Sequence, residues 1–280
     1  MSQWSCDNNH KAPAPDSVLT GQRAHVAPTV KPALTDMSQR SGDSREALTA
    51  GRGPQRRPRT RPSGVTLPAM PLPAWLISQL GRPRGLFGRF LARLLNRANL
   101  AMNLHMVGAL DLAPGAEVLE VGFGGGVALA LLLGHDPTLR VTGIDLAPDM
   151  LELARRRFAA ELRSGRLQLV QGVAEQLPFP TSHFDAACTA NCVYFWSDLD
   201  AGLRELARVL RPGGSLVVAI NAPEALIAAG FAARGLHTLS ADALVLRLHS
   251  AGFADAHARR LPDRGSHGAW IVRGHRDVTS

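Results

Sequence analysis

Residues 118–126 read Val-Leu-Glu-Val-Gly-Phe-Gly-Gly-Gly, and this stretch decides the fold. The apolar residues predict a buried strand, the glycines predict a turn, and the apolar run at 127–133 predicts a helix directly after it. The next predicted strand, 140–144, ends at Asp145. A glycine turn lets a ligand approach the backbone closely, and a carboxylate at the neighbouring strand's tip suits a ribose diol. The pattern therefore predicts a site for a nucleoside-containing cofactor.

The residues around the glycines indicate which nucleoside cofactor the turn suits. Dinucleotide-binding proteins carry G-x-G-x-x-G, in which the third glycine, or an alanine, packs the helix near the pyrophosphate. The third position of this chain is Val127 or Leu129, depending on the register, and neither fits. Glu120 precedes the turn, where a carboxylate would repel a pyrophosphate and attract a cationic amine. The pattern favours a cofactor with a nucleoside at one end and an ammonium group at the other, as in S-adenosylmethionine.

Five motifs carry a resemblance to a known family. They are V-L-E-V-G-F-G-G-G at 118–126, V-T-G-I-D-L-A-P-D-M at 141–150, G-V-A-E-Q-L-P-F-P at 172–180, the segment 184–196, and L-R-P-G-G-S-L-V-V-A-I at 210–220. With these motifs in order, the chain resembles class I S-adenosylmethionine-dependent methyltransferases, in particular the small-molecule branch that includes quinone C-methyltransferase-like proteins. The resemblance extends from about residue 70 to the C-terminus and implies S-adenosyl-L-methionine as the cofactor.

The resemblance also implies roles in the methionine and ribose half of the cofactor site. It places Glu120 at the methionine amine and Asp145 at the ribose hydroxyls. Asn191, at the end of a predicted strand, would approach the methionine moiety with its backbone. The turn under the methionine and ribose would be formed by Gly122, Gly124 and Gly126.

In the adenine half, one residue departs from the family pattern. The resemblance places Leu146 beside the adenine and the backbone of Ala174 at its edge. Family members often have G-D-A-E, whose Asp accepts the adenine amino group, whereas this chain has Val173 in G-V-A-E. We therefore expect adenine recognition through backbone groups, water or a neighbouring residue.

Strands alternate with helices along the chain, which predicts a parallel sheet covered on both faces. Pro148 begins a helix that runs toward Leu162; Ser197 with Asp200 has capping-box spacing, and Ser240 is expected to cap another helix. Further strands are predicted at 166–170, 184–190, 215–220, 254–261 and 269–273. The resemblance implies an α/β, doubly wound, mostly parallel seven-stranded sheet, the Rossmann-like methyltransferase fold, with 269–273 as the antiparallel strand and an N-terminal helical lid.

The chain divides into two parts of different composition. Residues 1–69 are rich in Pro, Ser, Thr, Arg and Gly and show no sustained apolar period, so we expect this extension to be disordered. An alternative is that translation begins at Met70 and the extension is a misassigned start. Residues 70–280 are expected to form the methyltransferase domain, with the helical lid at 70–110.

Charge and cysteine usage narrow the partners and the compartment. The net charge of +8 belongs to the N-terminal part, because residues 111–280 hold 16 arginines against 18 acids. A nearly neutral domain argues against a nucleic-acid track across its face. The three cysteines and the C-x-x-x-C spacing of Cys188 and Cys192 favour neither a disulfide framework nor a metal site. We expect a cytoplasmic protein, since no secretory segment and no apolar run of ~18 residues is present.

The segment 85–110 reads as one or two amphipathic helices with arginines on one face. The favoured interpretation is a lid packed over the cofactor cleft. A basic amphipathic helix can also lie on an anionic membrane surface, so peripheral membrane contact is the second interpretation. The lid and the membrane contact are compatible if the methyl acceptor is hydrophobic.

Candidates for contact with the methyl acceptor are Tyr194, Trp196, His105 and Asn221. The alternative for Tyr194 and Trp196 is ordinary aromatic packing, and for His105 it is helix packing. The sequence identifies no general base. The motif N/D-P-P-Y/F, expected in many amino-group methylators of nucleic acids, is absent, and N-C-V-Y stands at 191–194. This disfavours N-methylation of adenine or cytosine, though not every N-methylation. We expect a small, hydrophobic or aromatic acceptor that is methylated at C, O or N.

Three other functions stay open at this point. A non-catalytic S-adenosylmethionine-binding regulatory protein would keep the cofactor site without an acceptor pocket. A nicotinamide oxidoreductase would prefer NADH. An RNA methyltransferase would use the Arg-rich extension for salt-dependent RNA affinity.

Overall fold

The computed structural model describes residues 72–81, 85, 88, 99–262 and 268–278. All of them lie in the unit Ser63–Ser280. The predictions of a disordered segment at 1–69 and of a misassigned start therefore lie outside the described residues. So does part of the predicted lid at 70–110, of which two short helices are described. None of the helices in the described part is long and apolar enough to cross a membrane.

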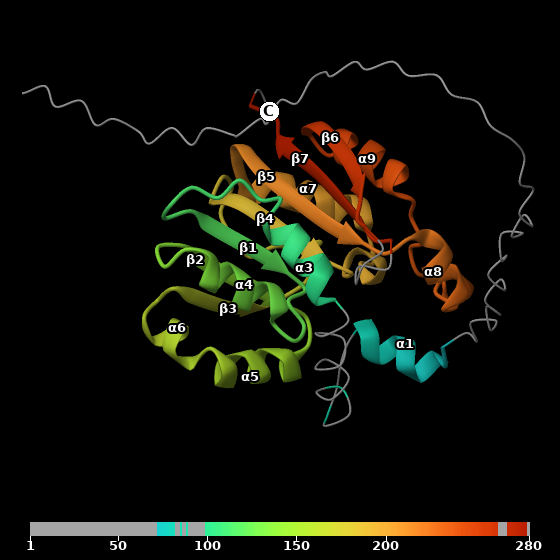
Figure 1. Cartoon of the computed structure of the whole chain (residues 1–280), viewed down its shortest axis with the longest axis horizontal. Coiled ribbons are helices and arrows are strands. Elements are labelled where there is room, and N and C mark those ends of the chain that lie inside the picture. The colour runs from blue at the N-terminus through green and yellow to red at the C-terminus, as the bar shows by residue number, and fades with distance from the viewer. Residues whose placement is uncertain (1–71, 82–84, 86–87, 89–98, 263–267, 279–280) are drawn as a thin grey trace, which may run out of the picture. The chain divides into compact units, whose positions relative to one another are not determined.

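A seven-stranded sheet forms the centre of the fold, in the order β3-β2-β1-β4-β5-β7-β6 (Figure 1). The pairs from β3 to β5 are parallel, whereas β7 runs antiparallel to β5 and β6. The strands are β1 (Glu117–Val121), β2 (Arg140–Asp145), β3 (Leu167–Gln171), β4 (Phe184–Ala190), β5 (Leu210–Ile220), β6 (Phe253–Arg260) and β7 (Trp270–Arg276). This confirms the predicted doubly wound α/β class with a mostly parallel seven-stranded sheet.

Helices cover both faces of this sheet because its central strands are apolar on both sides. Along β5, Val217 and Ala219 join one hydrophobic cluster, whereas Leu216 and Val218 join the other. The first cluster packs against α3 (Leu100–Val107), α4 (Val127–His135) and α5 (Pro148–Arg157). The second packs against α1 (Ala74–Gly81), α7 (Leu199–Val209), α8 (Pro223–Ala228) and α9 (Ala241–Ser250). The remaining elements are α6 (Ala159–Arg163), η1 (Val193–Phe195) and η2 (Ala232–Arg234).

The single helix expected from Pro148 toward Leu162 is interrupted. α5 ends at Arg157 and α6 begins at Ala159, with Phe158 between them at φ −111° and ψ 35°. The Phe158 ring packs against the glycine turn, so closely that a Cβ on Gly126 would lie 2.8 Å from its Cε2. The residue between the two helices thus makes a tertiary contact, which periodicity alone does not reveal.

The capping box expected for Ser197 and Asp200 is wrong. The N-cap of α7 is Asp198, whose side chain accepts the N–H of Ala201 at 2.9 Å. The N–H and the hydroxyl of Ser197 instead donate to Oε1 of Glu175, at 2.5 and 2.8 Å. The Glu175 carboxylate, from the loop after β3, thus binds the serine that local sequence spacing predicted to cap α7.

The C-terminal part follows the expectation. Ser240 is the N-cap of α9, and its hydroxyl accepts the N–H of Ala243 at 3.1 Å. β7 supplies the antiparallel strand, and its register pairs Val218 with Val272.

Candidate functional site

A cavity of about 440 Å³ lies beyond the carboxyl ends of β1, β2 and β4, at the point where the strand order reverses around β1. The glycine turn, the loop after β3, η1 and the end of α1 line it. Eight of the nine predicted cofactor-site residues face it: Glu120, Gly122, Gly124, Asp145, Leu146, Val173, Ala174 and Asn191. Gly126 does not line the cavity.

The three glycines of the turn all have left-handed φ, but they serve different purposes. A Cβ on Gly122 (φ +72°) would lie 2.9 Å from Cβ of Cys192, so this position keeps β1 close to the end of β4. Gly126 (φ +72°) makes room for Phe158 and begins α4 as its N-cap. Gly124 (φ +49°) has no heavy atom within 4 Å of the position its Cβ would take. Of the three, Gly124 is therefore the one whose bare backbone is left accessible to a ligand.

Asp145 holds this turn in place from the end of β2. Its Oδ2 accepts the N–H of Gly124 at 2.8 Å, and its Oδ1 accepts the N–H of Ala147 at 2.8 Å. Burial raises the pKa of Asp145, while these two backbone bonds oppose the rise. Each carboxylate oxygen keeps a second lone pair, so Asp145 can organise the turn and still accept a hydroxyl.

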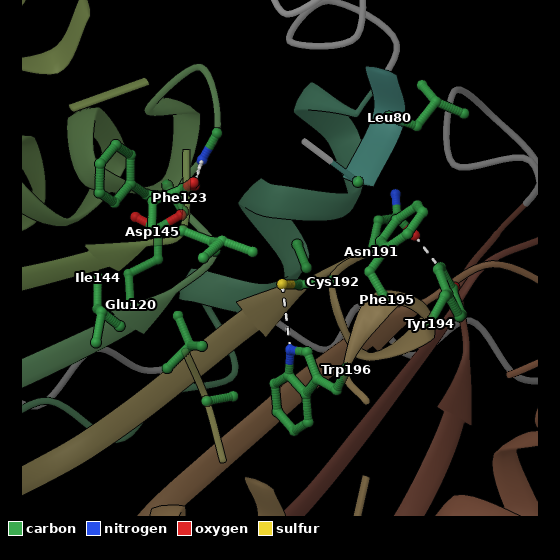
Figure 2. A pocket seen from close by; sticks show the side chains of 18 of the residues that line it. Leu80, Glu120, Phe123, Ile144, Asp145, Asn191, Cys192, Tyr194, Phe195 and Trp196 are labelled. Carbon is green, nitrogen blue, oxygen red and sulfur yellow. Dashed lines mark hydrogen bonds between the residues drawn. The ribbon is translucent and has the colours of Figure 1, made fainter. Parts of the chain in front are cut away.

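Glu120, on β1, is a buried carboxylate near Asp145 (Figure 2), and its hydrogen bonding is incomplete. Its side chain is 3 % exposed, and Oε2 has no hydrogen-bond partner among the described residues. Burial and, to a smaller extent, the charge of Asp145 raise the pKa of Glu120 from 4.5 to about 8, although the backbone N–H of Leu129 opposes the rise. A buried polar atom without a partner is costly, which indicates that this position is built for a ligand.

The part of the cavity that is predicted to take the adenine is apolar and accessible. Leu146 is 41 % exposed and Val173 is 38 % exposed, although both line the cavity. Ala174 is buried beside them. The carbonyl of Val173 accepts the N–H of Gln176 at 3.4 Å, so the loop has its own backbone bond here. Recognition of the adenine through backbone groups stays a prediction.

Three of the four acceptor candidates reach the cavity. Tyr194, Trp196 and Asn221 line it, whereas His105 on α3 does not. Tyr194 and Trp196 are also buried, so each of them packs in the core and contacts the cavity. Burial raises the pKa of the Tyr194 hydroxyl, which makes it a poor base.

Sequence reasoning did not select several residues that line the cavity. Asn99 and Asn103 enter it from the start of α3, and Glu175 enters from the loop after β3. Cys192, which follows β4, also lines the cavity. Burial raises its pKa to about 12, so the thiol stays protonated. Side-chain type offered no signal for the asparagines, because their positions depend on tertiary packing.

The residues present fit S-adenosylmethionine in polarity. Glu120 offers a partnerless carboxylate that suits an ammonium group, and Asp145 offers lone pairs that suit a ribose diol. Gly124 lies beside Asp145 with open space over its Cα, as a close-lying ligand requires. These residues would hold the two ends of the cofactor; the assignment of each contact stays a prediction. In the described part of the chain, no group of three or more His, Cys, Asp or Glu side chains could hold a metal ion.

Comparisons with known proteins point to one family. A methyltransferase domain model matches residues 119–218. The methyltransferase YdaC of Bacillus subtilis, which is described as uncharacterised, is 32 % identical over 127 residues that cover 45 % of this chain and 68 % of YdaC. Demethylmenaquinone methyltransferase of Thermus thermophilus is 40 % identical over 110 residues, which cover 39 % of this chain and 49 % of that protein. The chain thus spans about two thirds of the length of YdaC and about half of the length of the Thermus protein.

A solved structure shows the same fold. The S-adenosylmethionine-dependent methyltransferase of Mesorhizobium loti superposes with a TM-score of 0.52 at 19 % identity, over 64 % of this chain and 98 % of that one. Fold and cavity together define a Rossmann-like α/β protein with a nucleoside-cofactor site beyond its strand ends. The chain belongs to the class I S-adenosylmethionine-dependent methyltransferase family, and its cofactor is S-adenosyl-L-methionine.

Replacing Gly124 by Val should remove cofactor binding while the protein stays folded. The new side chain would stand over the backbone that the ligand approaches, and the left-handed φ of +49° adds a strain of about 1–3 kcal/mol. Titration calorimetry with S-adenosylhomocysteine and thermal unfolding measure the two effects. Gly213→Val is the matched control, because Gly213 has φ +77°, open space around it and no place in the cavity. We expect similar destabilisation in both variants and binding in the control alone; binding by Gly124→Val would remove the turn from the site.

Proposed function

We propose that this protein transfers a methyl group from S-adenosyl-L-methionine to a small, hydrophobic or aromatic acceptor. The observation that carries the proposal is the buried, partnerless carboxylate of Glu120 beneath a glycine turn that Asp145 organises. Aromatic and aliphatic side chains also line the cavity, among them Phe195, Leu226 and Phe231. The quinone acceptor in the name of the Thermus relative is of this kind.

The protein's contribution to the reaction is orientation. When bound, the cofactor supplies a methyl group that is already activated by a positively charged sulfur. The chain's own residues then have to hold the acceptor in line and exclude water. Cys192 and Tyr194, whose pKa values burial raises, are unsuited to take a proton at neutral pH. Glu175 is unsuited as well, because burial raises its pKa less than hydrogen bonds from its own backbone N–H, from Ser197 and from Asp198 lower it.

An RNA methyltransferase is disfavoured by the charge of the cavity. Its lining includes the carboxylates Glu120, Asp145 and Glu175, and no Lys, Arg or His is found among the described lining residues. A phosphate backbone would meet repulsion there. Peripheral membrane contact through 85–110 and a cytoplasmic location stay predictions.

Titration of the full chain with S-adenosylhomocysteine and, separately, with NADH tests the cofactor. We expect one molecule of S-adenosylhomocysteine to bind per chain and NADH to bind far more weakly. Tighter NADH binding would overturn the proposal in favour of an oxidoreductase. Transfer of a radiolabelled methyl group to a panel of neutral phenols and quinols then tests catalysis. Binding without transfer to any of them would favour the non-catalytic alternative.

A further inference from the structure

Four asparagines gather on one side of the cavity. Asn99 and Asn103 come from the start of α3, Asn191 follows β4, and Asn221 follows β5. Figure 2 shows Asn191 beside Tyr194 and Phe195, across the cavity from Glu120 and Asp145. Asn191 therefore lies in a part of the cavity away from the two carboxylates.

Hydrogen bonds fix the centre of this cluster. Oδ1 of Asn191 accepts from Nδ2 of Asn221 at 3.0 Å and from the hydroxyl of Tyr194 at 3.2 Å. Nδ2 of Asn191 donates to Oδ1 of Asn99 at 3.3 Å. The Tyr194 hydroxyl also accepts the backbone N–H of Asn221 at 2.5 Å. Asn191 sits at a left-handed φ of +52°, so the backbone is bent to bring its amide into this position.

The outer amides keep hydrogen-bonding capacity for a ligand. Nδ2 of Asn99 has no hydrogen-bond partner among the described residues, and neither does Oδ1 of Asn103 or of Asn221. Asn103 is only 6 % exposed and yet lines the cavity. One donor and two acceptors thus remain free toward the cavity, on the buried Asn103 and on the half-buried Asn99 and Asn221, where a ligand could match them.

The surroundings of the cluster select against charge. Amide side chains are neutral, and the charged side chains among the described lining residues are all carboxylates. An anionic acceptor would therefore meet repulsion from these carboxylates, and no described lining residue offers it a counter-charge. Next to the amides, the rings of Tyr194, Phe195 and Phe231 meet with centroids 5.8–6.3 Å apart, which forms an aromatic wall.

We propose that Asn99, Asn103 and Asn221, aligned by Asn191 and Tyr194, bind the oxygen-bearing edge of the acceptor and select a neutral, hydroxylated aromatic molecule. The aromatic wall takes the ring, and the amides match hydroxyl and carbonyl oxygens as donors and acceptors. The inference rests on the proposed function, because it names the acceptor class of the same site.

The test uses the full chain saturated with S-adenosylhomocysteine and two matched probes, 1-naphthol and 1-naphthoate, which is anionic at pH 7. Calorimetric titration should show 1-naphthol binding at least tenfold more tightly than 1-naphthoate. Asn103→Leu and Asn221→Leu should each weaken 1-naphthol binding about tenfold, the loss of one hydrogen bond, with S-adenosylhomocysteine affinity within threefold of wild type. Gln168→Leu removes an exposed amide outside the cavity and should change neither.

Each outcome of this test is decisive. Equal binding of the two probes, no binding of either, or unchanged 1-naphthol affinity in both leucine variants would overturn the acceptor assignment. If a leucine variant loses S-adenosylhomocysteine binding through misfolding, the comparison of the two probes on wild type still decides, and Tyr194→Phe supplies a variant that keeps the ring. That variant should weaken 1-naphthol several-fold, because the amides lose their alignment. Failure of wild type to bind S-adenosylhomocysteine would instead refute the proposed function itself.

Discussion

Glu120→Gln should stabilise the ligand-free protein and, at the same time, nearly abolish cofactor binding. Glutamine keeps the shape of the side chain but removes a buried charge, so the desolvation penalty on the ligand-free fold disappears. The cofactor's ammonium group then loses its counter-charge, which costs about 2–5 kcal/mol, or roughly 30-fold to several thousand-fold in Kd. Thermal unfolding and titration with S-adenosylhomocysteine at pH 8 measure the opposing changes. A variant that binds normally would show that the amine lies elsewhere.

The pKa of Glu120 also predicts a pH dependence. Because this pKa rises from 4.5 in the unfolded chain to about 8 in the folded one, the folded protein holds more protons between those values. The free energy of unfolding should therefore fall as pH rises from 4.5 to 8, by up to about 1.4 kcal/mol per pH unit from this group. Cofactor affinity should change in the other direction, rising toward pH 8, because the ammonium group requires the ionised carboxylate. Glu120→Gln should remove both slopes, and a wild-type affinity that is flat from pH 6 to 8 would contradict the assignment.

Asp145→Ala should weaken cofactor binding by about 1–3 kcal/mol, or roughly 5- to 150-fold. It removes the acceptor for a ribose hydroxyl and also the bonds that Asp145 makes to the N–H groups of Gly124 and Ala147. The turn should loosen, so stability should fall as well.

Asp136→Ala is the matched control for this change. The Asp136 carboxylate accepts the N–H and the hydroxyl of Thr138, at 2.7 and 2.5 Å, in the loop that precedes β2. It therefore lies at the opposite end of the strand from Asp145 and away from the cavity. We expect it to lose stability with unchanged affinity for S-adenosylhomocysteine. Equal affinity in the Asp145 variant and wild type would exclude Asp145 from the ribose site.

Most of the fold could be predicted because its signals are local. The apolar strands and the breaks between them gave β1, β2 and β4 to within one residue of their observed bounds. The polarity of the cofactor site was also local, because Glu120 and Asp145 end or nearly end neighbouring strands. The predictions were wrong at two places where a residue contacts a partner distant in sequence. Ser197 donates to Glu175 instead of forming the expected capping box. The helix predicted from Pro148 is interrupted at Phe158, whose ring packs against Gly126.

By itself, the sequence determined the α/β class, the glycine turn and the two acids on either side of it, since strand period and turn chemistry are written in adjacent residues. Only the tertiary structure decided that Gly124 leaves its backbone open to the cavity and that the Phe158 ring packs against Gly126. It also decided that Asn99, Asn191 and Asn221, from three separate segments, share one hydrogen-bonded cluster. The physical reason is that a parallel sheet brings the ends of its strands together, so residues far apart in the chain become neighbours only after the sheet has formed.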